Sequence, residues 1–303
     1  MTEHENHQHG GAPGHAQGHG GGHASHSGHS AGGHAHTTDA ELADTLELDA
    51  LILGSYLEEA SAWAAELMPE APATIIDVGA GSGAGTLALA RRFPEAQLTA
   101  LDKSADMLER TLAAATEGGF GARTAGLQAD LDGGWPASAA ADLLWASSSL
   151  HELADPERTM AEMFAALNRG GVLLVVEMDA LPSFLPDILA EDSAIEPGLE
   201  GRLHAVLAAR GWNHHPDWTA GLEGAGFAVE RRHFPSEGST TPELAARYGR
   251  AFLGRMASAL EGSASPADLA SLALLLGDGP ESLERRGGLV VRGHRTGWAA
   301  RKL

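Results

Sequence analysis

The chain of 303 residues contains no cysteine. This absence excludes disulfide bonds, thiolate metal sites and a cysteine nucleophile. Apolar runs long enough to span a bilayer are also absent, and the N-terminus lacks the basic and apolar stretches of a signal peptide. We therefore expect a cytoplasmic protein with no membrane partner. Hydrophobic residues make up 43% of the chain, which is enough for a sizeable core.

Basic residues are scarce. The 20 Lys and Arg are outnumbered by 41 Asp and Glu, which gives a formal net charge of −21. Such a charge repels phosphate backbones, so nucleic acid is not expected as a partner. The cations near the C-terminus are interpreted as an exposed strand face or edge; they are Arg285, Arg286, Arg292, Arg295, Arg301 and Lys302. The composition does not decide between a monomer and a homodimer.

Residues 1–38 differ from the rest of the chain. They contain ten glycines, ten histidines and no Leu, Ile, Val, Phe, Trp or Tyr, so we expect a disordered tail. Neutral imidazoles at this density bind Zn²⁺, Ni²⁺, Co²⁺ or Cu²⁺, which makes the histidines candidate metal ligands. A pH-responsive solubilising tail is the alternative. The candidate ligands are His4, His7, His9, His15, His19, His23, His26, His29, His34 and His36.

A glycine-rich turn is the main functional signal. Residues 75–78 are apolar except for Asp77 and predict a short buried strand. Residues 84–92 have a helical pattern. Between them lies Gly79-Ala80-Gly81-Ser82-Gly83. Strand, glycine turn and helix together bring backbone close to a nucleotide-like ligand. The same letters fit a dinucleotide fingerprint with Ala84 at its third position, so the flanking acids must decide between cofactors.

Three acids follow successive predicted strands. Asp102 ends the strand 97–101, where its carboxylate can accept bonds from both hydroxyls of a ribose, and Asp130 follows a third strand. Asp77, which precedes the glycines, would repel a pyrophosphate but attract an ammonium. S-adenosylmethionine (SAM) carries an ammonium and a sulfonium and no phosphate. The charge pattern therefore favours SAM over a dinucleotide.

These segments resemble the class I SAM-dependent methyltransferases, in the broad group that includes the ubiquinone and menaquinone C-methyltransferases. The similarity covers about residues 70–180, through DVGAGSG, LTALDKSADML, QADLD, ADLLWASSSLH and LNRGGVLLVVE. The resemblance implies the following cofactor-binding residues: Asp77, Gly79, Ala80, Gly81 and Gly83 at the methionine part, Asp102 at the ribose, Met107 and Leu131 at the adenine faces, Asp130 at the adenine amino group, and Lys103 and Ala146 nearby. Ordinary roles are the alternative: a tight turn for Gly79, a helix cap for Asp102 and a core position for Met107.

The alternating pattern of strands and helices predicts an α/β fold of the Rossmann-like type. Strands near 74–79, 97–101, 125–128, 141–146 and 171–177 alternate with helices near 84–92, 104–116 and 156–168, which indicates a mostly parallel sheet with helices on both faces. Two later strands, near 227–234 and 289–298, bring the number to the seven of the resembling family. We expect three parts: the tail 1–38, helices at 39–70 over the cofactor site, and a methyltransferase domain at 71–303. Helical insertions at about 180–224 and 235–286 would form a lid.

His151 is the candidate catalytic residue. Methyl transfer needs an aligned acceptor and, for some acceptors, a base that removes a proton. His151 follows the fourth predicted strand, where it would face the methyl group, and imidazole titrates near neutral pH. The alternative is a hydrogen-bonded loop residue that shapes the pocket. Glu152, Glu177 and Asp179 are weaker candidates.

The sequence therefore predicts a methyltransferase that uses SAM, forms S-adenosyl-L-homocysteine and acts on a small molecule. Apolar helical insertions suggest an apolar or aromatic acceptor. Two alternatives stay open: a SAM-binding enzyme that catalyses decarboxylation or cyclisation, and a metal-handling protein that works through the histidine tail.

Deletion of residues 1–38 tests the prediction for the tail. Because the segment has no residues that could join a core, the truncated protein should keep its melting temperature and its affinity for SAM. Binding of Ni²⁺ or Zn²⁺, measured by calorimetry, should fall sharply. A truncated protein that unfolds or loses affinity for SAM would show that the tail is structural.

Overall fold

The structure, a computed structural model, describes residues 39–303 except 138–139, 191–192, 212–215 and 239. The contacts divide the chain into residues 1–31 and 32–303, and all the described residues belong to the second unit. The predictions made for the tail and its ten histidines thus fall outside the described residues. None of the described helices is long and apolar enough to cross a membrane.

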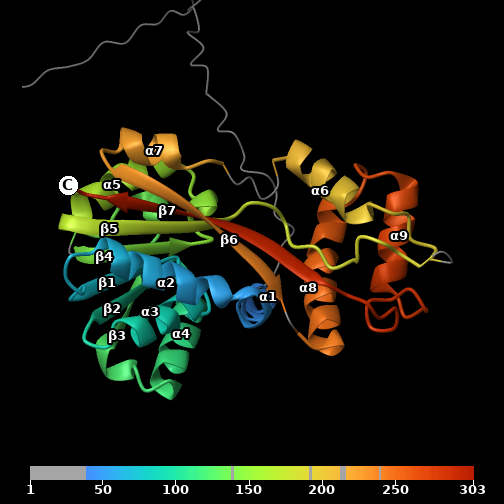
Figure 1. The fold of residues 1–303 in the computed structure, drawn as a ribbon, viewed down its shortest axis with the longest axis horizontal. Helices are drawn as coiled ribbons and strands as arrows, with labels where there is room; N and C mark the ends of the chain where they lie inside the picture. Colours follow the sequence, from blue (N-terminus) through green and yellow to red (C-terminus); the bar gives the residue numbers. More distant parts are fainter. Residues whose placement is uncertain (1–38, 138–139, 191–192, 212–215, 239) are drawn as a thin grey trace, which may run out of the picture. The chain divides into compact units, whose positions relative to one another are not determined.

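Seven strands form a single sheet in the described part of the chain (Figure 1). They are β1 (Thr74–Val78), β2 (Gln97–Asp102), β3 (Thr124–Gln128), β4 (Ala141–Ser147), β5 (Leu167–Met178), β6 (Ala228–Gly238) and β7 (Val291–Arg301). Their order is β3-β2-β1-β4-β5-β7-β6. Strands β1 to β5 run parallel to one another, and β7 is antiparallel to both β5 and β6. The predicted Rossmann-like sheet is confirmed. Because the order reverses between β1 and β4, a ligand is expected at the carboxyl ends of these two strands.

The helices begin where the sequence supplies caps. The described helices are α1 (Asp39–Leu53), α2 (Ser55–Leu67), α3 (Ala84–Arg92), α4 (Ala105–Glu117), α5 (Pro156–Ala166), α6 (Leu199–Ala209), α7 (Thr219–Gly224), α8 (Pro242–Leu260) and α9 (Pro266–Leu276). Side chains of Ser104, Asp155, Thr241 and Ser265 accept backbone N–H bonds at the starts of α4, α5, α8 and α9. Three of these caps precede a proline, which suits the first helical turn.

The boundary between α5 and β5 differs from the prediction. Periodicity suggested a helix up to 168, whereas α5 ends at Ala166 and β5 begins at Leu167. The cause lies at the far end of the chain. The Lys302 ammonium donates to the carbonyl of Leu167 at 2.7 Å, and the amide of Gly170 donates to the carbonyl of Lys302 at 2.9 Å. These long-range bonds stop the helix earlier than local propensity would.

Apolar side chains cover the two faces of the sheet separately. On one face, Trp63 of α2 and Leu89 of α3 pack with Trp145, Val176 and Phe234. On the other, Met163 of α5 and Leu222 of α7 pack with Leu144, Val175 and Trp298. The sheet is therefore buried on both faces, as a parallel sheet requires.

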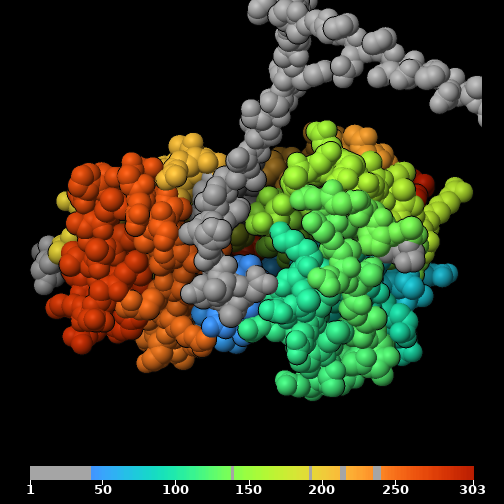
Figure 2. Space-filling view, turned by 180° about the vertical axis from the view of Figure 1, so that it is seen from behind, coloured from blue at the N-terminus to red at the C-terminus, as the bar shows by residue number. Residues whose placement is uncertain are grey.

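A third core lies beyond the carboxyl ends of β5 and β6. It joins α6, α8 and α9 to the C-terminal half of α1, and its largest members are the rings of Phe184, Tyr248 and Phe252. These segments come from the two predicted insertions. In Figure 2 the orange surface, which includes α8, and the green surface of the sheet domain flank a blue patch from the start of the described chain.

The turn after β1 fits closely against the loop after β4. The amides of Gly79 and Ala80 both donate to the carbonyl of Leu101, and Gly79 has φ of +70°. A Cβ on Gly79 would lie 2.5 Å from the Cβ of Ser149, which is closer than packed atoms allow. Only glycine fits this position, both for its backbone angle and for its neighbour.

Gly79→Ala should therefore destabilise the protein more than Gly119→Ala. Gly119 has a similar φ of +82° but nothing within 4 Å of its added Cβ, so its substitution carries the backbone strain alone. We expect about 1–3 kcal/mol of additional loss for Gly79→Ala from the steric overlap, measured by urea unfolding. Equal losses in the two variants would contradict the packing described for Gly79 and Ser149.

Candidate functional site

The glycine-rich loop and Asp102 face each other across the ends of β1 and β2. The Asp102 carboxylate accepts a bond from the amide of Gly81 at 2.9 Å and another from the amide of Ser104 at 2.9 Å. Both Gly81 and Gly83 have positive φ values, of +54° and +93°. The loop therefore presents backbone beside a carboxylate that is fixed by two amides.

Helix α1 lies over this loop. An added Cβ on Gly81 would lie 3.3 Å from Cδ1 of Leu46, and Arg110 of α4 donates to Glu47 of α1 at 3.4 Å. A ligand on the glycine loop would therefore lie close to α1 as well as to the sheet.

Asp77 is buried beneath the start of α3. Its side chain is only 3% exposed and accepts a bond from the hydroxyl of Thr86 at 2.6 Å. Burial, followed by the charge of Asp102, raises the pKa of Asp77 to about 7. The indole N–H of Trp145 is buried nearby and has no acceptor; a Cβ added on Gly85 would lie 2.9 Å from this nitrogen and 3.1 Å from Oδ2 of Asp77. A cation near this carboxylate would favour its charged form.

The other predicted cofactor residues lie in the glycine loop, after β2 and β3, on α4 and on β4. Ala80, Met107, Leu131 and Ala146 are buried and apolar. Asp130 is exposed, and its carboxylate accepts the amide of Asp132 at 3.1 Å. The side chain of Lys103 is exposed.

His151 is held by a buried glutamate. Its Nδ1 lies 2.8 Å from Oε2 of Glu177, a residue with no exposed surface, and its Nε2 lies 3.4 Å from Oε1 of Glu152. The other oxygen of Glu177 accepts the amides of Ser149 and Leu150 at 3.1 and 2.9 Å. Burial by itself would lower the pKa of His151, but the hydrogen bonds and charges of Glu152 and Glu177 outweigh it and raise the pKa to about 10. The imidazole is therefore charged at neutral pH.

A second buried polar cluster joins α1, α8 and β7. Arg295 donates from Nη2 to both oxygens of Asp49, at 2.9 and 2.7 Å, and the hydroxyl of Tyr248 donates to Oδ1 of Asp49 at 2.7 Å. The guanidinium also lies 5.0 Å from the ring centroid of Tyr56, whose hydroxyl is 3.1 Å from Oγ of Ser147 at the end of β4. This cluster therefore reaches the carboxyl edge of the sheet.

The position of Arg295 corrects an interpretation made from the sequence. The C-terminal cations suggested an exposed strand face, but Arg295 is only 2% exposed. Its partner Asp49 is 246 residues away in the chain, so no local pattern could identify the pair. Tyr248 was missed for the same reason.

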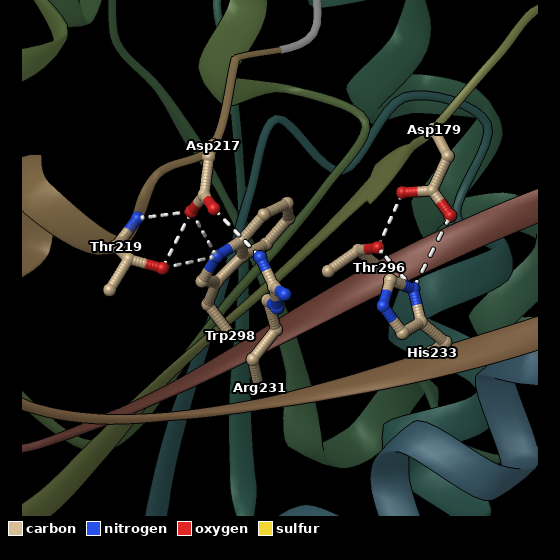
Figure 3. Close-up of polar contacts among 7 residues, drawn as sticks. All are labelled: Asp179, Asp217, Thr219, Arg231, His233, Thr296 and Trp298. Atoms are coloured by element: carbon tan, nitrogen blue, oxygen red, sulfur yellow. Dashed lines mark hydrogen bonds and ion pairs between the residues drawn. The ribbon is translucent and has the colours of Figure 1, made fainter.

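Two further polar groups include residues of β7 (Figure 3). In one, the Thr296 hydroxyl contacts both Asp179 and the ring of His233, at 2.8 Å from Nδ1. In the other, Asp217 accepts bonds from Thr219 and Trp298 and pairs with Arg231. Asp179, one of the weaker candidates for the catalytic base, is therefore held by Thr296 and His233. Within the described ranges, no group of three or more His, Asp or Glu residues is arranged to hold a metal ion.

Known proteins match the part of the chain that contains the glycine loop. A family model described as a methyltransferase domain matches residues 75–171, from β1 into β5. The malonyl-[acyl-carrier protein] O-methyltransferase of Laribacter hongkongensis is 32% identical over 144 residues, which cover 46% of each chain. The trans-aconitate 2-methyltransferase of Methylobacterium radiotolerans is 35% identical over 152 residues, which cover 49% of this chain and 50% of the relative. The chain thus spans about half the length of the curated relatives it matches.

A solved structure has a similar fold. It is a candidate methyltransferase from Bacillus halodurans C-125, with 21% identity and a TM-score of 0.52, and the alignment covers 82% of this chain and 99% of that chain. At this identity the likeness concerns the fold. Taken with the strand order and the family match, it supports a class I SAM-dependent methyltransferase domain that includes residues 75–171.

Proposed function

We propose that the protein transfers the methyl group of SAM to a small molecule. The observation that carries this proposal is the glycine loop held against Asp102, within the segment that matches a methyltransferase domain. The loop fits SAM because its glycines leave backbone uncovered and because Asp77 and Asp102 give the site a negative potential. A sulfonium and an ammonium suit such a potential, whereas a pyrophosphate does not.

The residues of the chain would hold SAM along the carboxyl edge. Asp102 would accept bonds from the ribose hydroxyls, and the loop from Gly79 to Gly83 would lie at the methionine part, near the charge of Asp77. Buried Met107 and Leu131 would contact the adenine, and Asp130 its amino group. When bound, SAM supplies a methyl group on a positively charged sulfur. The sulfur is the leaving group and keeps the electron pair of the broken carbon–sulfur bond.

The role of His151 depends on its proton. Glu177 holds Nδ1, so Nε2 is the nitrogen that could act on an acceptor. The imidazolium has no lone pair at Nε2. To act as a base, His151 must therefore first lose the proton from Nε2. The half-exposed Glu152 opposes this loss because its charge stabilises the imidazolium. Displacement of Glu152 by an acceptor would make His151 a stronger candidate base at neutral pH.

The acceptor would be a small molecule. Apolar helical insertions favour an apolar or aromatic body, and the rings of Phe184, Tyr248 and Phe252 lie in their shared core. The two relatives are named for trans-aconitate and a malonyl group, both of which bear carboxylates. An acceptor that combines an apolar body with an acidic group would suit both observations.

Several predictions from the sequence stay open beside this proposal. Membership of the quinone C-methyltransferase group, metal binding by the tail, a homodimer and a cytoplasmic location are among them. Decarboxylation or cyclisation would use the same SAM site. Formation of S-adenosylhomocysteine distinguishes methyl transfer from these reactions.

Asp102→Ala should weaken the binding of S-adenosylhomocysteine. The substitution removes the acceptor for two ribose hydroxyls, which should cost about 1–3 kcal/mol, or roughly five- to a hundredfold in affinity. Asp106→Ala is the matched control, because Asp106 is exposed in the first turn of α4. Calorimetry that gives equal affinities for the two variants would exclude the assignment of Asp102.

Glu152→Gln should shift the pH dependence of turnover to lower pH. Loss of the negative charge lowers the pKa of His151 from about 10, so the neutral base forms at lower pH and turnover at pH 8 rises. Below the pKa, turnover with an acceptor that must lose a proton should rise about tenfold per pH unit. His151→Gln should abolish this rise, and Glu157→Gln, an exposed change in α5, should leave it unchanged.

Two measurements check the prediction for His151. NMR titration of its ring follows the pKa without any acceptor, and the pH profile of kcat follows the reaction. If the ring titrates identically in the wild type and in Glu152→Gln, the charge of Glu152 does not raise the pKa of His151 and the prediction is wrong. A kcat profile that His151→Gln leaves unaltered would refute the base role.

A further inference from the structure

The hydroxyl of Ser149 is buried without a hydrogen-bond partner. Among the buried side-chain atoms of the described ranges that lack a partner, its Oγ is the only oxygen, and the others are nitrogens of indole, imidazole and guanidinium groups. The backbone groups of the same residue are satisfied, because the amide donates to Glu177 at 3.1 Å and the carbonyl accepts from the amide of Glu152 at 3.3 Å. A buried hydroxyl that makes no bond loses its hydration and lowers the stability of the folded protein.

The backbone that leads to this hydroxyl is also unfavourable. Ser148 has φ of +54°, and in the part of the chain that the structure describes it is the one residue other than glycine with a positive φ. This conformation costs free energy in a residue with a side chain. It persists because the amide of Ser148 donates to Val176 at 2.8 Å while the amide of Ser149 is held by Glu177. Two neighbouring residues therefore carry costs that the fold retains, which is typical of ligand sites.

The loop after β4 places this hydroxyl against the glycine turn. If Gly79 had a Cβ, that atom would lie 3.3 Å from Oγ of Ser149. Gly79 follows β1 and Ser149 follows β4, and the order of the sheet reverses between these two strands. In α/β sheets a ligand binds in the crevice at this point. The unpartnered hydroxyl therefore lies at the edge where the methionine part of SAM is expected.

The charges around Ser149 favour a positively charged partner. Glu177 binds the amide of Ser149, and Asp77 is the penultimate residue of β1. The imidazolium of His151 does not reverse this balance, because the carboxylates of Glu152 and Glu177 lie 3.4 and 2.8 Å from its two ring nitrogens. SAM carries an ammonium at its methionine end, and a hydroxyl oxygen can accept one of the three N–H bonds of an ammonium.

We propose that the hydroxyl of Ser149 accepts a hydrogen bond from the ammonium of SAM. The proposal rests on the methyl transfer proposed for this protein and adds a residue to its cofactor site. Rotation about the Cα–Cβ bond can turn Oγ toward the ligand, because a serine side chain has three staggered rotamers. The bond gives the hydroxyl the partner that it lacks, and it offsets part of the cost of removing the ammonium from water. Ser149 thereby fixes the methionine end of SAM.

Two serine variants separate a binding role from a structural one. Ser149→Ala removes the hydroxyl and keeps the Cβ, which is the atom of this residue nearest to a Cβ added on Gly79. Ser61→Ala is the matched control, because Ser61 is only 1% exposed and its hydroxyl donates to the carbonyl of Glu58 at 3.0 Å within α2. The full-length proteins are titrated by calorimetry with three ligands: S-adenosylhomocysteine, its analogue without the amino group and its analogue without the carboxylate.

Loss of the hydroxyl should have opposite effects on binding and on stability. Ser149→Ala should bind S-adenosylhomocysteine and the decarboxylated analogue roughly ten- to a hundredfold more weakly than the wild type, as expected for loss of a hydrogen bond to a charged group. Its affinity for the analogue without the amino group should stay unchanged. Without ligand it should melt about 2–4 °C higher, because an unsatisfied buried hydroxyl has been removed. Ser61→Ala should match the wild type in affinity and should not melt at a higher temperature.

The outcomes separate this inference from the function on which it rests. If the wild type binds none of the three ligands, the proposed SAM site and the methyl transfer fail. If the wild type and Ser149→Ala bind S-adenosylhomocysteine equally well, the SAM site stands and the role of Ser149 is wrong. A loss of affinity that follows the carboxylate and not the amino group would overturn the assignment to the ammonium. A lower melting temperature of ligand-free Ser149→Ala would show that the hydroxyl stabilises the fold, and a structural role would then replace the proposed one.

Discussion

A charge buried in a protein must be paired or hydrogen-bonded, and this constraint shapes the carboxyl edge of the sheet. Glu177 has no exposed surface, and the donors that satisfy it come from three consecutive residues, Ser149, Leu150 and His151. The loop after β4 therefore takes its course around one carboxylate. Its first residue, Ser148, has φ of +54°, an uncommon value for a residue with a side chain. Bonds on both sides of Ser148 hold this backbone in place.

The same constraint connects the third core to the sheet. Asp49 of α1 lies between Arg295 of β7 and Tyr248 of α8, and all three polar groups are largely removed from water. Removal of one member would leave an unpaired charge, which costs more than the intact pair contributes. These bonds hold α1 in place, and Leu46 of the same helix lies against the glycine loop. Buried charges thus determine where the insertions meet the edge at which a ligand is expected.

Charge also explains why His151 differs from an ordinary histidine. Its two carboxylate neighbours are unlike each other: Glu177 is buried and fixed, whereas the side chain of Glu152 is 47% exposed. A fixed partner sets the orientation of the ring, and an exposed partner can move when a ligand arrives. Orientation and protonation state are therefore controlled by different residues. This separation gives an acceptor a direct means to alter the proton affinity of the ring.

The sequence by itself determined the features that depend on neighbouring residues. Hydrophobic runs and the glycine turn are local, and they predicted the strands, most of the helices and the edge that carries Asp102. The caps at Ser104, Asp155, Thr241 and Ser265 that the structure shows are local too. The tertiary structure alone decided the rest. Arg295 and Asp49, and Tyr248 and Asp49, are separated by long stretches of chain, and their contacts depend on how the insertions fold over the sheet. An arginine in a strand has the same local signature whether its charge faces water or a buried carboxylate, because only packing determines which one it meets.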